Sequence, residues 1–102
     1  MILRFFRAIV LDGQQDEFKA FFLGKALPIV RAQKGLISAT VGLPHPSSPN
    51  EFAMVMLWRD LDALKGFTGD QWQHAVIDPA EKHMLAETHV YHYEAGDEAA
   101  VV

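Results

Sequence analysis

Five histidines are the side chains best suited to acid–base or metal chemistry in this chain of 102 residues, but their spacing favours no shared metal ion. His89 and His92 are three residues apart in a predicted strand, so their side chains leave opposite faces. His74 and His83 have neither a histidine partner at helical i, i+4 spacing nor a zinc-type spacing. His45 stands alone in a proline-rich stretch. We therefore expect no metal site and interpret each histidine as a single acid–base, core or surface group.

Nucleophilic and nucleotide-dependent chemistry also lack their usual motifs. The chain has no cysteine, and its serines (Ser38, Ser47 and Ser48) are not in the context of a nucleophile elbow. No glycine-rich segment resembles a phosphate or dinucleotide cradle. If the protein is an enzyme, we therefore expect it to work without a covalent nucleophile and without a nucleotide-binding motif.

An apolar pocket lined by aromatic side chains, with a few polar groups at its wall, is the remaining chemical possibility. The candidate aromatic walls are Phe6, Trp58, Phe67, Trp72, Tyr91 and Tyr93. The candidate polar groups are Arg4, Arg7, His74 and His92. Core packing explains any one of these aromatics more simply than ligand contact does. For His92, a hydrogen bond across a subunit interface would give the same sequence pattern as a role in a site.

Composition and charge restrict the class of protein. The length fits one domain over residues 1–102, and half of the residues are apolar. The net charge is −4 and no run of Lys and Arg occurs, so we expect neither nucleic acid nor a membrane surface as partner. The opening MILRFFRAIV is too short for a membrane span and does not resemble a signal peptide. We expect a cytoplasmic protein, in keeping with the absence of cysteine.

The elements that would position a site are organised around residues 52–58, which are apolar at every position. An antiparallel strand with one solvated face would alternate apolar and polar residues, so this run predicts a central strand covered on both faces. Helices of a chain this short can cover one face only. We therefore predict a homodimer formed through the sheet, with residues such as Met54 and Met56 on the interface face.

Before this strand, the pattern predicts a strand over 2–10 and a helix that starts at a capping box formed by Asp12 and Gln15. Pro28 should kink or split that helix, and Gly35 should end it. A second strand is predicted over 36–43, followed by an exposed hairpin loop over 44–50 that holds three prolines. The apolar stripe of the helix comprises Phe18, Phe21, Phe22, Ala26, Ile29 and Val30.

After the central strand, Asp60 is predicted to cap a short helix that begins at Leu61 and breaks near Gly69. The segment Asp78-Pro79-Ala80-Glu81 predicts a further short helix over about 79–85. The last strand is predicted over 88–94, and residues 95–102 are predicted to be loosely held. The order β-α-β-β-α-β predicts an α+β, ferredoxin-like fold: an antiparallel sheet with helices on one face.

The stretch LWRDLDALKGFTGDQWQHAVIDP and the later VYHYE resemble the antibiotic biosynthesis monooxygenase-like family of dimeric α/β barrels. The resemblance covers nearly the whole chain. Its motifs are mostly structural. The matching positions are Trp58, Asp60, Ala63, Leu64, Phe67, Gly69, Asp70, Ala75, Val76, Pro79, His92, Tyr93 and Glu94, with Lys34-Gly35 before the second strand.

Two positions depart from the family pattern. Many members carry a glutamate where this chain has Met56, and many have a histidine in the second helix where this chain has Phe67. The histidine that ligates iron in haem-degrading members has no clear counterpart, since its place falls near Val76. The resemblance therefore does not favour haem degradation.

Within these limits, the resemblance implies a cofactor-independent monooxygenase that acts on a phenolic or hydroquinone-like aromatic. His92 would be the catalytic base or proton relay, and the candidate substrate-binding residues are Arg4, Phe6, Trp58, Phe67 and Trp72. The alternative is a non-catalytic dimeric barrel that binds a small ligand or has a role in stress response. A cavity of about 300 Å³ or more between sheet and helices, with His92 or an arginine at its wall, would favour a ligand.

Overall fold

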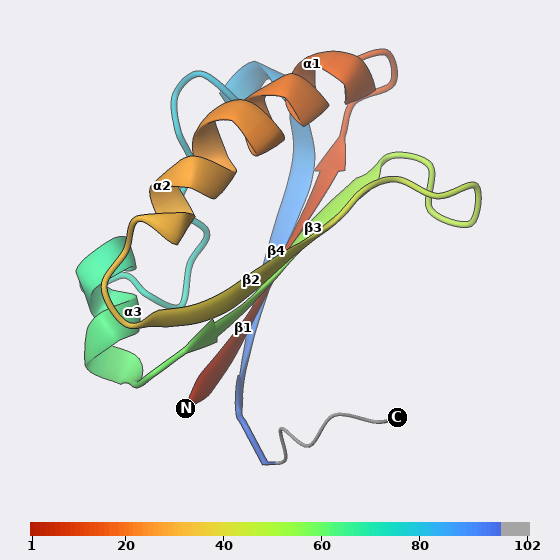
Figure 1. Cartoon of the computed structure of the whole chain (residues 1–102). Coiled ribbons are helices and arrows are strands. Elements are labelled where there is room, and N and C mark those ends of the chain that lie inside the picture. Colours follow the sequence, from red (N-terminus) through yellow and green to blue (C-terminus); the bar gives the residue numbers. More distant parts are fainter. Residues whose placement is uncertain (97–102) are drawn as a thin grey trace.

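A computed structural model describes residues 1–96 and contains one four-stranded antiparallel sheet. The strand order in the sheet is β2-β3-β1-β4, so the first and third strands are central (Figure 1). This order and the β-α-β-β-α-β succession confirm the predicted α+β, ferredoxin-like fold. The elements are β1 (Ile2–Val10), α1 (Gln15–Phe21), η1 (Phe22–Ala26), α2 (Leu27–Arg31), β2 (Leu36–Gly42), β3 (Glu51–Trp58), α3 (Leu61–Thr68), η2 (Lys82–Met84) and β4 (Leu85–Glu94).

The central strands bury alternate residues, and this alternation decides which face the helices cover. On β3, the side chains from Phe52 to Trp58 at even positions are buried, and those between them are only partly buried. Met54 and Met56 therefore face the helices, so their predicted place on the interface face was wrong. The uninterrupted apolar run did not indicate which alternate residues face the helices, because the residues on both faces of β3 are apolar.

The long helical segment that crosses this face is interrupted before Pro28, as the sequence predicted. Residues 22–26 of η1 are wound as a π-helix between α1 and α2. Proline clashes with the carbonyl four residues earlier and donates no hydrogen bond, and a wider turn just before it relieves both problems. The extra residue shifts the apolar stripe, so Leu27 is buried and Ile29, which was predicted to be part of the stripe, is exposed.

The predicted capping box at the start of α1 does not form. Gln14 is the N-cap residue and makes no side-chain capping bond. The Asp12 carboxylate accepts a hydrogen bond from the Asn50 side chain instead, at 2.7 Å, and the Gln15 side chain bonds Asn50 and the Gly13 amide. The two polar residues therefore tie the β1–α1 turn to the end of the β2–β3 loop.

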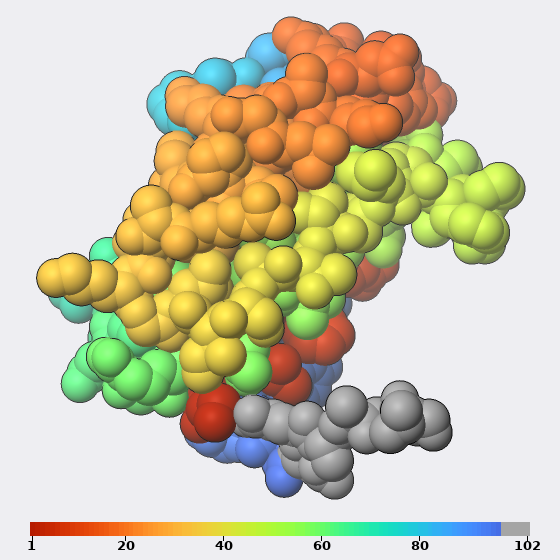
Figure 2. All heavy atoms as spheres, viewed as in Figure 1, coloured from red at the N-terminus to blue at the C-terminus, as the bar shows by residue number. Residues whose placement is uncertain are grey.

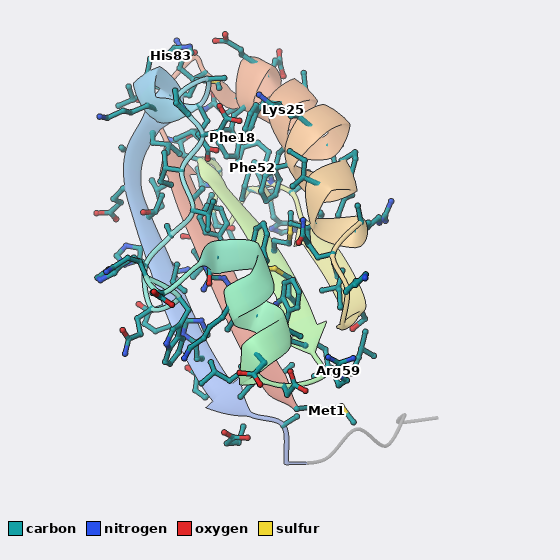
Figure 3. All side chains as sticks on the ribbon, turned by 90° about the vertical axis from the view of Figure 1, so that its left-hand side faces the viewer. Met1, Phe18, Lys25, Phe52, Arg59 and His83 are labelled. Carbon is teal, nitrogen blue, oxygen red and sulfur yellow. The ribbon has the colours of Figure 1, made fainter. Side chains whose placement is uncertain are left out.

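Phenylalanines join the helical segment to the sheet. The rings of Phe18 and Phe52 lie between α1 and β3 with centroids 4.8 Å apart, and Figure 3 shows both residues in this layer. Phe22 packs against both of them. Burying three such rings is a large favourable contribution, roughly 1.5–3 kcal/mol each, and it fixes the helical segment over one end of the sheet.

The second helix of the fold is capped as predicted, since the Asp60 carboxylate accepts a hydrogen bond from the Ala63 amide at 2.8 Å. This bond, together with Arg59, lowers the pKa of Asp60. Gly69 ends α3 with a positive φ of 77°. Gly35, which does not end the preceding helix, makes the turn into β2, where any Cβ would collide with the Cβ of Ala63.

Residues 69–81 form an irregular loop that runs from α3 along the helix-covered side of the sheet to η2, in the teal segment of Figure 1. The predicted helix over 79–85 is reduced to the single turn of η2, and β4 starts at Leu85, three residues earlier than predicted. The capping hydrogen bonds predicted for the 78–81 segment are nevertheless formed. The Glu81 carboxylate accepts from the Asp78 amide, and the Asp78 carboxylate accepts from the Ala80 amide.

The opposite face of the sheet is covered by no helix of residues 1–96 (Figure 1). It carries apolar side chains on both central strands and two tyrosines, Tyr91 and Tyr93, that are 43% and 54% exposed. On the two central strands of this face, Arg7 of β1 and Glu51 of β3 form a salt bridge of 2.7 Å. The 44–50 loop projects beyond the body of the molecule, as Figure 2 shows in yellow-green. Most of the predicted tail lies outside the described residues.

Candidate functional site

A pocket lies between the helix-covered face of the sheet and the helical layer. Its free volume is about 50 Å³, which is below the value of about 300 Å³ expected for a site that holds a drug-sized ligand. Its wall is mainly apolar and carries two ionisable groups, Arg4 from β1 and Glu81 from the loop before η2. The main apolar lining residues are Phe6, Phe22, Met54, Met56, Phe67 and Val76.

Arg4 is the charged residue that the sheet contributes, and its side chain is almost fully enclosed, with 1% exposure. It faces the helices because it alternates with Phe5 along β1. Its guanidinium donates hydrogen bonds to the backbone carbonyls of Trp72 at 2.6 Å and His74 at 3.0 Å. Burial lowers the pKa of Arg4 to about 10, so the group stays cationic at neutral pH. Arg4 therefore both charges the pocket and ties the 69–81 loop to the sheet.

His92 lies beside Arg4 on β4, opposite it in strand register. Its Nε2 is 2.9 Å from Arg4 Nη1. Because a guanidinium can only donate, Nε2 must accept this bond, and a neutral His92 therefore carries its proton on Nδ1. Burial and the charge of Arg4 lower the pKa of His92. The predicted base is thus held neutral, with its free lone pair already bound to the arginine.

Trp58, Trp72 and Phe67 have three different positions relative to the pocket. Phe67 lines it, and the buried Trp58 stacks behind Phe67 with ring centroids 5.6 Å apart. Trp72 packs edge-on against the imidazole of His92, at 4.9 Å between centroids. Among the predicted substrate-binding aromatics, Phe6 and Phe67 therefore form part of the pocket wall. Trp58 packs behind Phe67, and Trp72 packs against His92.

Other candidates lie away from the pocket. Arg7, Tyr91 and Tyr93 are on the uncovered face of the sheet, so the pocket roles considered for them were wrong. The His74 side chain is exposed, and only its backbone carbonyl reaches Arg4. Strand alternation accounts for the error, because the sequence did not reveal which parity of β1 and β4 faces the helices.

Glu81 is the ionisable residue of the site that sequence reasoning missed. The sequence predicted it only as a capping residue, but its side chain is 5% exposed and forms part of the pocket wall. Burial raises the pKa of Glu81, and the neighbouring Asp78 carboxylate adds to the rise, while the Asp78 amide and Lys25 oppose it. A glutamate at the third position of a capping box is common, so the sequence alone carried no signal of this burial.

Two buried donors have no hydrogen-bond partner within residues 1–96: Arg4 Nε and Trp58 Nε1. In the same residues, no group of three or more His, Asp or Glu side chains is arranged to hold a metal ion. No helix there is long and apolar enough to cross a membrane. The chemistry available at the site is therefore that of one cation, one carboxyl group, one imidazole and an apolar wall.

Comparison with known proteins agrees with this architecture. The family model described as antibiotic biosynthesis monooxygenase matches residues 1–78. A protein from Deinococcus radiodurans superposes with a TM-score of 0.78 at 18% identity, over 100% of this chain and 99% of that one. SnoaB, a cofactor-independent oxygenase from Streptomyces nogalater, gives 0.71 at 18% identity, over 95% and 94%. Rv0793 from Mycobacterium tuberculosis gives 0.73 at 17% identity, over 97% and 98%.

A search of curated proteins gives no significant match. At these identities the solved structures establish the fold, and the family model covers more than half of the sequence. The chain therefore belongs to the antibiotic biosynthesis monooxygenase family.

Proposed function

We propose that this protein is a cofactor-independent monooxygenase that oxidises a phenolic or hydroquinone-like aromatic. The observation that carries the proposal is a cation, Arg4, enclosed at the wall of an apolar pocket and in contact with a neutral imidazole. Once a base has taken the hydroxyl proton, the Arg4 cation stabilises the phenolate, which is the form of the substrate that can reduce dioxygen. Family membership supports the same class of reaction.

The reaction balances without a cofactor. A base removes the hydroxyl proton of the phenol, the phenolate transfers an electron to O2, and the radical pair joins at a ring carbon to give a hydroperoxide. Loss of water then leaves a quinone. One oxygen atom becomes the new carbonyl, and the other leaves as water with the hydroxyl proton and the hydrogen from the ring carbon. The protein supplies the base, the anion site and exclusion of bulk water.

In this proposal, Arg4 holds the phenolate and His92 acts as base or relay. His92 Nε2 is engaged with Arg4, so the two roles are coupled: a substrate oxygen that replaces Nε2 at Arg4 Nη1 frees the imidazole lone pair to accept a proton. Phe6 and Phe67 would contact the ring, and Trp58 and Trp72 would hold Phe67 and His92 in place.

Oxygen uptake with a panel of hydroquinones, anthrones and naphthols tests the proposal. We expect the wild type to consume oxygen with at least one member of the panel and His92→Ala to lose about 10²–10⁴-fold in rate, the usual range for a general base. His45→Ala, in the exposed loop, is the matched control and should behave as wild type. The proposal fails if wild type and His92→Ala are equally inert across the panel.

We further propose that the protein is a homodimer that buries the uncovered face of the sheet. The support is the apolar character of that face, where the rings of Phe5 and Tyr93 meet edge-on at 5.6 Å, while the helices of residues 1–96 lie on the other side. Large apolar patches on a protein surface often mark sites of interaction with another protein. The expected occupant is a second copy of the chain, which gives a mass twice 11.4 kDa in solution.

The small cavity favours a second candidate function, a non-catalytic dimeric barrel. A volume of about 50 Å³ holds a few water molecules, whereas a cavity of roughly 150 Å³ is needed for benzene. An aromatic substrate therefore requires Met54 and Met56 to repack, which their flexible side chains allow. If no member of the panel binds or is oxidised, this second function is the better description.

A further inference from the structure

We propose that Glu81, in place of His92, is the residue of the pocket that accepts the substrate proton, and that the ligand it selects is a small, neutral phenol. This inference rests on the proposed function and assigns a catalytic residue that the sequence pattern identified only as a helix cap. Once Met54 and Met56 have repacked to admit the ring, the phenol hydroxyl would donate to Glu81 Oε1, and the ring would lie against the apolar wall that includes Phe67.

The hydrogen bonding of the carboxylate leaves one oxygen available. Oε2 accepts from the Asp78 amide at 3.0 Å, which satisfies the capping role. Oε1 has no hydrogen-bond partner within residues 1–96. It is not one of the fully enclosed polar atoms without a partner, which are Arg4 Nε and Trp58 Nε1, so part of its surface is accessible. Glu81 is only 5% exposed and forms part of the pocket wall, and we infer that this second oxygen is the one it presents to the pocket.

A capping role alone does not account for a carboxylate at this depth. The reciprocal bond of a capping box is made equally well by glutamine, which carries no charge and costs less to bury. The charged groups around Glu81 are Asp78 and Lys25, which form a 2.9 Å salt bridge with each other, and Arg4, which lines the same pocket. None of them forms a salt bridge with Glu81 in the described chain. A buried carboxylate with a free oxygen is the arrangement of a general base.

The proposed step is a proton transfer. The O–H bond of the phenol breaks and a new O–H bond forms on Glu81 Oε1, which leaves the electron pair on the phenolate oxygen beside the Arg4 cation. The carboxylic acid returns the proton to the departing water after O2 has reacted. His92 would then be the residue that positions Arg4, through the bond from Arg4 Nη1 to its Nε2.

Binding of 4-nitrophenol, a single-ring probe whose phenol and phenolate absorb at different wavelengths, tests the assignment without requiring turnover. The wild type should bind the phenol about tenfold or more tightly than the phenolate, because a carboxylate accepts from the former and repels the latter. Glu81→Gln keeps the bond to the Asp78 amide and should lose this preference. Glu87→Gln, at an exposed position on β4, is the matched control and should retain it.

The outcomes separate this inference from the proposed oxygenase activity. Equal preference for the phenol in wild type and Glu81→Gln overturns the assignment even if both consume oxygen. Lost preference in Glu81→Gln without oxygen uptake by the wild type supports the assignment and contradicts the oxygenase. Failure of the wild type to bind the probe overturns the assignment, whatever the uptake with larger aromatics. If the oxygenase is active, Glu81→Gln should also abolish the acidic limb of its pH–rate profile, which in wild type lies above pH 4.5 because the pKa is raised.

Discussion

Replacing Arg4 with methionine tests whether one buried arginine holds the 69–81 loop against the sheet. The variant removes two hydrogen bonds from a charged donor to the carbonyls of Trp72 and His74, each contributing roughly 1.5–3 kcal/mol. It also removes the cost of burying a charge, which offsets part of the loss. We expect a net decrease of about 2 kcal/mol in the free energy of unfolding, since methionine fills most of the same volume.

Urea denaturation at fixed protein concentration measures this change. A loss of 2 kcal/mol moves the midpoint by about 1 M for a slope of ~2 kcal/mol/M. Hydrogen exchange of the backbone amides of residues 69–81 should accelerate more than exchange in the central strands, because the loop loses its attachment before the sheet does. Arg31→Met, at an exposed position at the end of α2, is the control. The reasoning is refuted if both variants shift the midpoint equally and exchange in the loop is unchanged.

Three further predictions concern assembly, packing and pH. Leu57→Asp, on the uncovered face of β3, should convert the dimer into a monomer by light scattering; a wild-type monomer would contradict the dimer itself. Gly35→Ala should lower the free energy of unfolding, measured in urea, by more than ~1 kcal/mol, because the φ of Gly35 is +83° and an added Cβ would collide with the Cβ of Ala63. Gly24→Ala is the control, and it should be neutral or slightly stabilising because a Cβ added there has no neighbour within 4 Å. The pKa of His92 is lowered in the folded state, so the unfolded chain binds more protons than the folded chain between pH 6.5 and that lowered pKa. The free energy of unfolding should therefore fall as the pH decreases through this range. His92→Gln should remove this part of the pH dependence of stability, and His45→Gln should leave it unchanged.

The two tryptophans illustrate how far a family pattern leads. Trp58 is buried with its ring stacked on Phe67, as expected for the last residue of a central apolar strand. Trp72 lies in a loop with no regular periodicity, and its contact with His92 depends on the path of that loop across the sheet. The first position was predictable from the apolar run, whereas the second was known only as an aromatic in a matching segment.

The sequence by itself determined the succession of elements, the antiparallel sheet with helices on one side, the cap at Asp60, the break at Gly69 and the disruption near Pro28. These features follow from local chemistry: backbone dihedral limits, capping geometry and apolar periodicity act within a few residues. The tertiary structure alone decided which face of the sheet meets the helices. Both faces of β3 are apolar, and strand alternation sorts the residues into two faces without showing which face the helices cover. It also decided that Arg4 and Glu81, from opposite ends of the chain, share one pocket wall. Their meeting depends on the path of an irregular loop, which no local pattern encodes.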